Sequence, residues 1–390
     1  MKCEEIYEKV YQQEPYAVAF CPYRISPLGA HIDHQHGKIN GLAIDKGIHM
    51  AYHPKNNGVV ELQSLNFIKR AQFFVNAVPE KRQGDWADYL RGAAKVLGEK
   101  YQIKIGLSGI IEGSLPIGGL SSSAAVTICF LTALCQVNGI QLERAELISI
   151  AKAAENQYVG VSCGKLDQSC EVLSKKNNLL YLDTQNDNFE LIPINDKMKP
   201  YKIAIFFSGL ERSLKNSKYN LRQDECKAAA YALMGYAGMN YDTFENTFLR
   251  DVPVDVFNEY KERLPKAWCR RAEHYYSEFE RAEKGANLWR RGDLEGYGQL
   301  VFESGYSSIY NYECGCDELK KLYQIICNTD GIYGGRFSGA GFKGCCMALI
   351  NPDKADEIED NVCRKYLKEF PALEGKYSFH LCESEDGVKI

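Results

Sequence analysis

The sequence lacks long apolar stretches and runs of basic residues, and each absence excludes a class of protein. No segment stays apolar for long enough to cross a bilayer, so we expect no membrane partner. The 47 basic and 51 acidic residues are mixed along the chain and give a formal net charge of -4. Without a basic run that could bind a phosphate backbone, we expect no nucleic-acid partner either.

Cysteine pairs at the spacing of a zinc knuckle are also absent, although the chain has 15 cysteines. Residues 1–5 are charged and no apolar leader follows them, so we expect the protein in the cytosol with its cysteines as thiols. Two close pairs, Cys314 with Cys316 and Cys345 with Cys346, could in principle hold a metal or a disulfide. We interpret them as small apolar residues of a reduced protein.

The chain does contain enough apolar residues for two domains. At 390 residues it exceeds what one hydrophobic core usually organises, and 45% of its residues are apolar. Short β-rich runs alternate with amphipathic helical stretches, which indicates an α+β fold. We place the boundary near residue 200, with an N-terminal domain over 1–200, a C-terminal domain over 201–390 and a cleft between them.

Several elements are predicted individually from composition and periodicity. Residues 185–198 are polar and turn-like. In the second half we predict helices over 220–235, 265–291 and 316–328, followed by a glycine-rich turn and a strand over 346–350.

A loop rich in glycine and serine is the strongest local signal. Residues 116–125 read PIGGLSSSAA and open an apolar stretch that predicts a buried helix over 121–137 with hydroxyl caps at its start. The start of a helix has unpaired N–H groups and a partial positive charge, which suit a phosphate group. Ordinary serine capping of a core helix explains the pattern as well. The residues concerned are Gly118, Gly119, Leu120, Ser121, Ser122 and Ser123.

Two other glycine patterns do not fit the motifs that they resemble. Residues 160–165 approach a Walker A loop, but Leu166 stands where a Ser or Thr should bind magnesium. Residues 339–344 match the letters of a dinucleotide fingerprint, but a predicted strand follows them instead of the required helix. Neither a P-loop nor an NAD site is predicted.

Polar side chains gather in two further parts of the sequence. Residues 22–34 bring one arginine, two histidines and one aspartate into a short turn-rich stretch. Residues 155–156 and 163–168 add two carboxylates around a glycine turn. Each residue alone is more typical of a surface salt bridge or a turn, but their occurrence together with the serine loop favours one shared polar site.

These segments together resemble the GHMP small-molecule kinases, and within them the galactokinase branch, along nearly the full chain. The three motifs of the family are matched at residues 22–34, 116–125 and 335–345. The resemblance implies a two-domain α+β fold with the active site in the cleft between the domains. It also implies ATP as phosphate donor, Mg²⁺ as its metal and a small sugar as substrate.

The resemblance also implies a role for individual residues. Asp167 corresponds to the carboxylate that receives the proton of the sugar C1 hydroxyl, and Arg24 to the cation beside it. Ser123 and Glu155 correspond to the magnesium ligands of the family, which suits a hard cation that prefers oxygen. His31, Asp33, Gly164 and Tyr219 correspond to sugar contacts, residues 118–123 to the loop around the nucleotide phosphates, and Gly339 and Gly341 to the third glycine loop.

Two positions depart from the galactokinase pattern. The loop between Pro116 and Leu120 is one residue shorter than usual, and Ala30 stands where galactokinases carry a Glu that binds the outer sugar hydroxyls. Losing that Glu removes a negative charge from the place of a C6 carboxylate. Like charges about 4 Å apart repel by roughly 1 kcal/mol in water and about 4 kcal/mol at an intermediate dielectric. About 1.4 kcal/mol is a factor of ten, so this change can admit a uronate.

We therefore expect D-galacturonate as the substrate. The runs 27–35, 312–315 and 336–346 resemble plant-type galacturonokinases more than ordinary galactokinases. A carboxylate in the pocket should meet a cation, and Arg212 is the candidate, although a surface arginine explains this residue equally well.

Two alternatives stay open. The first is a plain galactokinase, or a kinase for another sugar with an axial C4 hydroxyl, and a substrate panel would separate it from a galacturonokinase. A sugar sensor without turnover would be expected to have a damaged catalytic set, whereas Arg24, Asp167, Ser123 and Glu155 are all present. For the oligomeric state we expect a monomer or a weak dimer.

Overall fold

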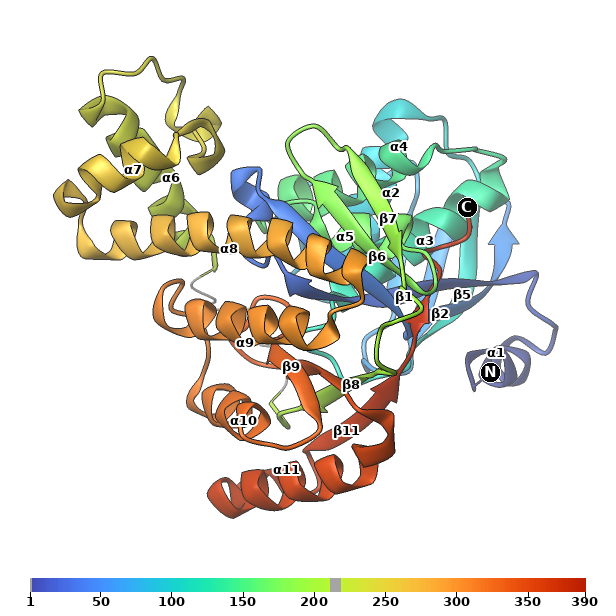
Figure 1. Ribbon diagram of the computed structural model, residues 1–390. Helices are drawn as coiled ribbons and strands as arrows, with labels where there is room; N and C mark the ends of the chain where they lie inside the picture. Colours follow the sequence, from blue (N-terminus) through green and yellow to red (C-terminus); the bar gives the residue numbers. More distant parts are fainter. Residues whose placement is uncertain (1, 211–218) are drawn as a thin grey trace.

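A mixed sheet forms the frame of the N-terminal half (Figure 1). The computed structural model describes residues 2–210 and 219–390, and in that part of the chain eight strands belong to this sheet. Strand β3 pairs with β5 in parallel, and the other pairs are antiparallel. The main path is β4 (Ala71–Phe74), β3 (Val59–Ser64), β5 (Gly106–Gly113), β2 (Lys38–Lys55), β6 (Asn178–Asp183) and β7 (Phe189–Pro193), while β1 (Ala17–Leu28) and β12 (Ser384–Glu385) also pair with β2.

Helices pack on this sheet because their apolar residues need a partner surface. Helices α3 (Ser122–Asn138) and α5 (Leu166–Leu173) lie on β1 and β2, and α2 (Asp88–Lys100) and α4 (Arg144–Ala153) pack against α3. Helix α3 is apolar around most of its circumference, as a buried helix should be. A π-helical turn over Ala154–Val159 continues α4. Helix α1 (Lys2–Tyr11) packs separately on β2 and β5.

The C-terminal half contains a second sheet and most of the remaining helices. This antiparallel sheet has the order β11 (Ser378–Cys382), β8 (Lys202–Phe207), β10 (Cys345–Ile350) and β9 (Ile332–Phe337). Helices α9 (Leu294–Tyr310), α10 (Asp317–Cys327) and α11 (Ala355–Glu369) lie beside it in Figure 1. Helices α6 (Tyr219–Tyr236) and α7 (Val254–Tyr260) form a lobe with the start of the long α8 (Lys266–Arg291).

The two halves are joined by a shared hydrophobic core. Trp289 of α8, Tyr297 of α9 and Met347 of β10 belong to the same buried cluster as the strands and helices of the N-terminal half. After β11 the chain returns, and Ser384 of β12 pairs with Ile44 of β2. The predicted boundary near residue 200 falls between β7 and β8. It stays a prediction.

The predicted α+β architecture is confirmed. Helices α6, α8 and α10 and strand β10 begin and end within one residue of the predicted bounds. Among the residues that the structure describes, no helix combines the length and the apolar character needed to cross a membrane.

Two sequence-based expectations for elements fail for identifiable reasons. The stretch 185–198 was predicted to be turn-like, but it contains β7, a short edge strand whose apolar residues stand between the polar residues 185–188 and 195–197. Helix α9 was not predicted, because Gly296, Gly298 and Gly305 lower its apparent helix propensity. These glycines have a packing role. A Cβ on Gly298 would lie 2.0 Å from the carbonyl oxygen of Tyr333 in β9.

Replacing Gly298 with alanine should therefore destabilise the protein although alanine favours helices. The clash is with backbone, so α9 and β9 must separate, at a cost of about 1–3 kcal/mol for overpacking. Gly235→Ala in α6 is the matched control, since a Cβ there meets no atom within 4 Å. It should be neutral or stabilising by up to about 1 kcal/mol. Urea unfolding measures both, and equal midpoints would contradict the packing role of Gly298.

Candidate active site

A cavity of about 720 Å³ lies where the two halves meet, and side chains from both line its wall. Most of the predicted site residues are brought together there. Gly118, Leu120, Ser122 and Gly341 belong to the adjoining loops but do not line the cavity. Arg212 lies outside the described residues. The predicted residues that line it are Arg24, Ala30, His31, Asp33, Gly119, Ser121, Ser123, Glu155, Gly164, Asp167, Tyr219 and Gly339.

An ion pair between Arg24 and Asp167 forms the centre of the cavity wall. Arg24 of β1 donates from Nε to Oδ1 of Asp167 at 2.8 Å and from Nη1 to the carbonyl of Gly119 at 3.1 Å. The arginine side chain is 3% exposed, whereas the aspartate at the start of α5 is 29% exposed. Burial alone would lower the pKa of Arg24. The charge of Asp167 and the hydrogen bond between the two side chains more than offset this effect, so the pKa is raised. The pair therefore presents one fixed cation and one carboxylate that a ligand can reach.

Asp33 is held against Gly164, where only glycine fits. A Cβ on Gly164 would lie 2.0 Å from Oδ2 of Asp33, and that oxygen accepts from the backbone N–H of Leu166 at 3.2 Å. Burial, together with the charge of Asp167, raises the pKa of Asp33 to about 6. Two carboxylates thus share one wall of the cavity, and Asp33 changes its charge near neutral pH.

The aromatic and histidine side chains of the cavity are uncharged. The ring of His31 stacks on Tyr312 with 4.3 Å between centroids and 9° between planes. Burial, aided by the charge of Arg336, holds the pKa of His31 well below its usual range. Burial and the charge of Asp33 raise the pKa of Tyr219 well above its usual value. His31 and Tyr219 therefore offer neutral hydrogen-bonding groups to a ligand.

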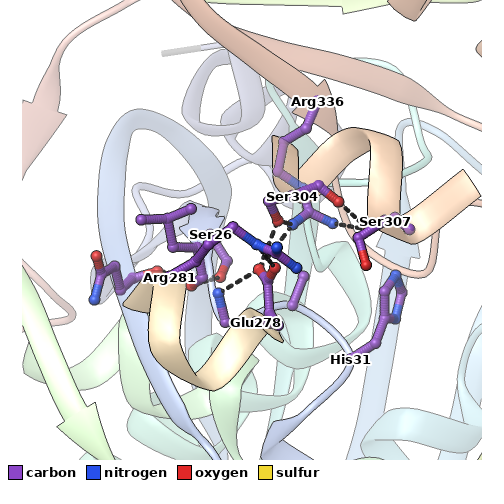
Figure 2. Close-up of polar contacts among 12 residues, drawn as sticks. Ser26, His31, Glu278, Arg281, Ser304, Ser307 and Arg336 are labelled. Atoms are coloured by element: carbon purple, nitrogen blue, oxygen red, sulfur yellow. Dashed lines mark hydrogen bonds and ion pairs between the residues drawn. The ribbon is translucent and has the colours of Figure 1, made fainter. Parts of the chain in front are cut away.

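A buried carboxylate of α8 holds the turn that carries Ala30 (Figure 2). Oε1 of Glu278 accepts from the backbone N–H of Gly29 at 2.8 Å and from Oγ of Ser304 at 2.5 Å. Its Oε2 accepts from Nε of Arg281 at 2.8 Å, and Arg336 lies 3.4 Å from Oε1. Burial raises the pKa of Glu278, but Arg281 and Arg336 more than offset that effect and lower it to about 2. Glu278 is therefore a permanent anion with charged donors around it.

His274 completes the attachment of this turn. Its Nε2 lies 3.0 Å from the carbonyl oxygen of Ala30, which can only accept, so Nε2 carries the hydrogen. The other ring nitrogen, Nδ1, lies 2.9 Å from Oγ of Ser307. Neither His274 nor Glu278 was predicted from the sequence. Their signal was present, because these polar residues stand four apart on the helix stripe that continues with Ala282 and Ala286, all of them buried.

The serine loop begins α3 without the predicted hydroxyl cap. Ser121 stands at the N-cap with a φ of 59°, and no side chain caps the helix. Its Oγ is buried and has no hydrogen-bond partner among the described residues. The capping prediction is therefore wrong. An unpaired buried hydroxyl on a cavity wall at a helix start is suited to an acceptor such as a phosphate oxygen.

The two predicted glycine loops touch each other across the cavity rim. A Cβ on Gly339 would lie 2.8 Å from the carbonyl oxygen of Gly119, and one on Gly119 would lie 2.7 Å from Sγ of Cys345. Both glycines have positive φ, 89° at Gly119 and 67° at Gly339. Backbone and side chains of other residues can approach this closely only because both positions lack a Cβ.

The two side chains predicted to hold a magnesium ion lie next to the serine loop. Ser123 and Glu155 both line the cavity, and Oε1 of Glu155 accepts from Nε2 of Gln168 at 2.9 Å. The π-helical turn places Glu155 at this wall. Over residues 2–210 and 219–390, no cluster of three or more His, Cys, Asp or Glu could hold a metal. A hydroxyl with one carboxylate nevertheless fits Mg²⁺, which takes few protein ligands and keeps waters and substrate phosphates.

Comparison with known proteins identifies the family. Models of the GHMP kinase N-terminal and C-terminal domains match residues 88–175 and 286–368, and a galactokinase galactose-binding signature matches residues 5–54. The galacturonokinase of Arabidopsis thaliana is 38% identical, with 96% of this chain and 93% of the relative covered. The chain belongs to the GHMP kinase family. Like the other kinases of this family, it takes the transferred phosphoryl group from ATP.

Other relatives support the same assignment. The galactokinase of Staphylococcus saprophyticus is 31% identical over 98% of this chain and 97% of its own length. The crystal structure of Lactococcus lactis galactokinase complexed with galactose has a TM-score of 0.88 and 26% identity, with 99% of this chain and 98% of that chain covered. The predicted two-domain GHMP kinase fold and the prediction of a sugar 1-kinase are thereby confirmed.

The raised pKa of Asp33 predicts a pH-dependent sugar affinity. Below about pH 6 the carboxyl is neutral. If Asp33 accepts hydrogen bonds from sugar hydroxyls, as the family resemblance implies, kcat/KM should fall about tenfold per pH unit there. Asp33→Asn should have a lower kcat/KM that does not change through this range.

Stability should change in the opposite sense, which provides a control. Because folding raises the pKa of Asp33, its ionised form destabilises the folded state above about pH 6. Asp33→Asn should therefore raise the urea midpoint at pH 8, and this gain should shrink as the pH falls towards 4. A wild-type pH profile that is flat between 5 and 7 would contradict the role of Asp33 in sugar binding.

Proposed function

We propose that this kinase transfers the γ-phosphoryl group of ATP to the C1 hydroxyl of D-galacturonate and releases α-D-galacturonate 1-phosphate and ADP. The observation that carries the proposal is the position of Ala30. This residue is 8% exposed, lines the cavity and has its carbonyl fixed by His274. Its side chain is therefore held at the wall of the cavity. Where a Glu would repel a C6 carboxylate, a methyl group leaves room for it.

Asp167 is the proton acceptor in this proposal. It takes the proton of the C1 hydroxyl while the C1 oxygen bonds to the γ-phosphorus, and the bond from that phosphorus to the bridging oxygen breaks to release ADP. No covalent enzyme intermediate is needed. Arg24, 2.7 Å from the carboxylate, holds Asp167 in place and offsets negative charge that spreads over the transferred group.

The nucleotide phosphates are proposed to lie along residues 118–123 and against the third glycine loop. The unpaired hydroxyl of Ser121, the start of α3 and the close contact between Gly119 and Gly339 support this location. Ser123 and Glu155 would hold Mg²⁺, which neutralises phosphate charge when it is bound. His31, Asp33, Gly164 and Tyr219 would contact the sugar.

We also propose a cytosolic location. All fifteen cysteines are free in the structure, which suits a reducing compartment. The expectation of a monomer or weak dimer stays a prediction.

A substrate panel with two Ala30 variants tests the choice of sugar. Release of ADP is measured with galacturonate, glucuronate, galactose and arabinose. Wild-type kcat/KM should be at least about tenfold higher for galacturonate than for galactose. Ala30→Glu should lower this ratio at least about tenfold by charge repulsion, whereas Ala30→Gln adds the same bulk without the charge and should lower it less.

The outcomes distinguish a wrong choice of sugar from a wrong assignment of the kinase activity. A wild-type preference for galactose would mean that the substrate is not galacturonate, while the sugar kinase assignment would stand. Equal effects of Ala30→Glu and Ala30→Gln would mean that size, and not charge, decides which sugar binds. Absence of ADP release with every sugar would favour the sensor alternative.

A further inference from the structure

Among the described residues, four cationic side chains line the cavity, and they differ in their partners and in their location. Arg24 binds Asp167, and Lys343 belongs to the third glycine loop beside Gly339. Arg222 and Lys320 remain, on the side of the cavity that Glu313 and Gly315 also line. A carboxylate on the sugar would have to find its partner on this side, away from the phosphates.

Arg222 is buried and only partly satisfied. It lies on α6 three residues after Tyr219, and both side chains face the cavity. Its Nη1 donates to Glu225 at 2.8 Å, and its Nη2 donates to the backbone carbonyl of Glu313 at 3.4 Å and lies 3.7 Å from the carboxylate of Glu313. Nε is buried and has no hydrogen-bond partner among the described residues, and the whole residue is only 8% exposed. A buried guanidinium with an unused donor is incomplete, so the site has room for another acceptor.

The segment around Glu313 connects Arg222 with the turn that carries Ala30 and His31. Immediately before Glu313, Tyr312 stacks flat on His31, and immediately after it, Sγ of Cys314 lies 3.8 Å from Nε2 of His31. His31 follows Ala30 directly in the chain. Ala30 and Arg222 therefore lie on neighbouring parts of one cavity wall, joined through residues 312–314.

Charges around Arg222 are unbalanced. Arg271 pairs with both Glu225 and Glu313, and Arg270 pairs with Glu313 at 2.8 Å. Together with Arg222, three guanidinium groups face two carboxylates among the residues that the structure describes, so one positive charge is in excess within this set. A carboxylate of the substrate would balance it, whereas the neutral C6 hydroxyl of galactose would not.

We propose that Arg222 binds the C6 carboxylate of the sugar and thereby determines specificity for a uronate. This inference rests on the proposed function and names the residue that recognises its substrate. Among the described residues, Arg222 takes the role for which the sequence suggested Arg212. The guanidinium provides a planar, permanently charged donor set that matches a carboxylate, which an amide or an ammonium cannot reproduce.

The experiment compares two sugars on three variants. Arg222→Gln should raise the KM for galacturonate at least about tenfold, because hydrogen bonds to a charged group are lost. The galactose constant, measured as KM or as a competitive inhibition constant, should change less than about threefold. Arg222→Lys keeps the charge and should restore part of the galacturonate affinity. Arg270→Gln is the control, since Arg270 shares Glu313 but does not line the cavity, and it should leave the ratio of the two constants unchanged.

Each outcome decides between the inference and a structural role. If Arg222→Gln weakens both sugars equally, Arg222 only supports the fold and the inference is wrong. If Arg222→Gln does not fold, as thermal unfolding would show, Arg222→Lys must change the ratio of the two sugars or the inference fails. A wild-type enzyme that prefers galactose would overturn the proposed function itself, independently of these variants.

Discussion

The carboxylate of Glu278 is the interaction on which the arrangement of the site depends. It is fully buried and gathers groups that are far apart in the sequence: the backbone of Gly29, Ser304 on α9, and the guanidinium groups of Arg281 and Arg336. A buried charge is costly unless charged donors surround it, and removing one partner typically costs about 3–5 kcal/mol. The network therefore fixes the turn of the sugar motif to the C-terminal half of the molecule.

The same network reaches the third glycine loop. Arg336 lies on β9, and the chain continues from it through Phe337 and Ser338 to Gly339, which touches Gly119. Arg24 in turn binds the carbonyl of Gly119 and the carboxylate of Asp167. The sugar motif, the serine loop and the third loop are thus connected by polar contacts and by the close packing of Gly339 on Gly119. A kinase needs this, because transfer depends on holding two substrates in line with few degrees of freedom.

Much of the fold and of the cavity could be predicted from the sequence. Helices such as α8 carry their periodicity locally, and motifs at 22–34, 116–125 and 335–345 carry the family resemblance, so most predicted residues line one cavity. Contacts over long separations could not be predicted. Gly29 and Glu278 are 249 positions apart, and no local pattern indicates that they meet.

Other features depend on backbone geometry that composition does not determine. Ser121 has a left-handed backbone conformation, and its hydroxyl does not cap α3, although serine is typical of the N-cap position. The glycines of α9 look unfavourable for a helix until the close approach of β9 explains them. Likewise, the sequence does not show whether an arginine on α6 faces solvent or a cavity, so the position of Arg222 on the cavity wall could not be predicted.

The measurement that tests the account most directly is sugar binding against turnover for Asp167→Asn. Asn keeps the shape of Asp but cannot accept the C1 proton, so kcat should fall by about 10²–10⁴, the usual contribution of a general base. The dissociation constant for galacturonate, measured by calorimetry, should change only a few-fold. Retained turnover, or a loss of sugar binding as large as the loss of kcat, would contradict the assignment of Asp167 as the proton acceptor of a sugar 1-kinase.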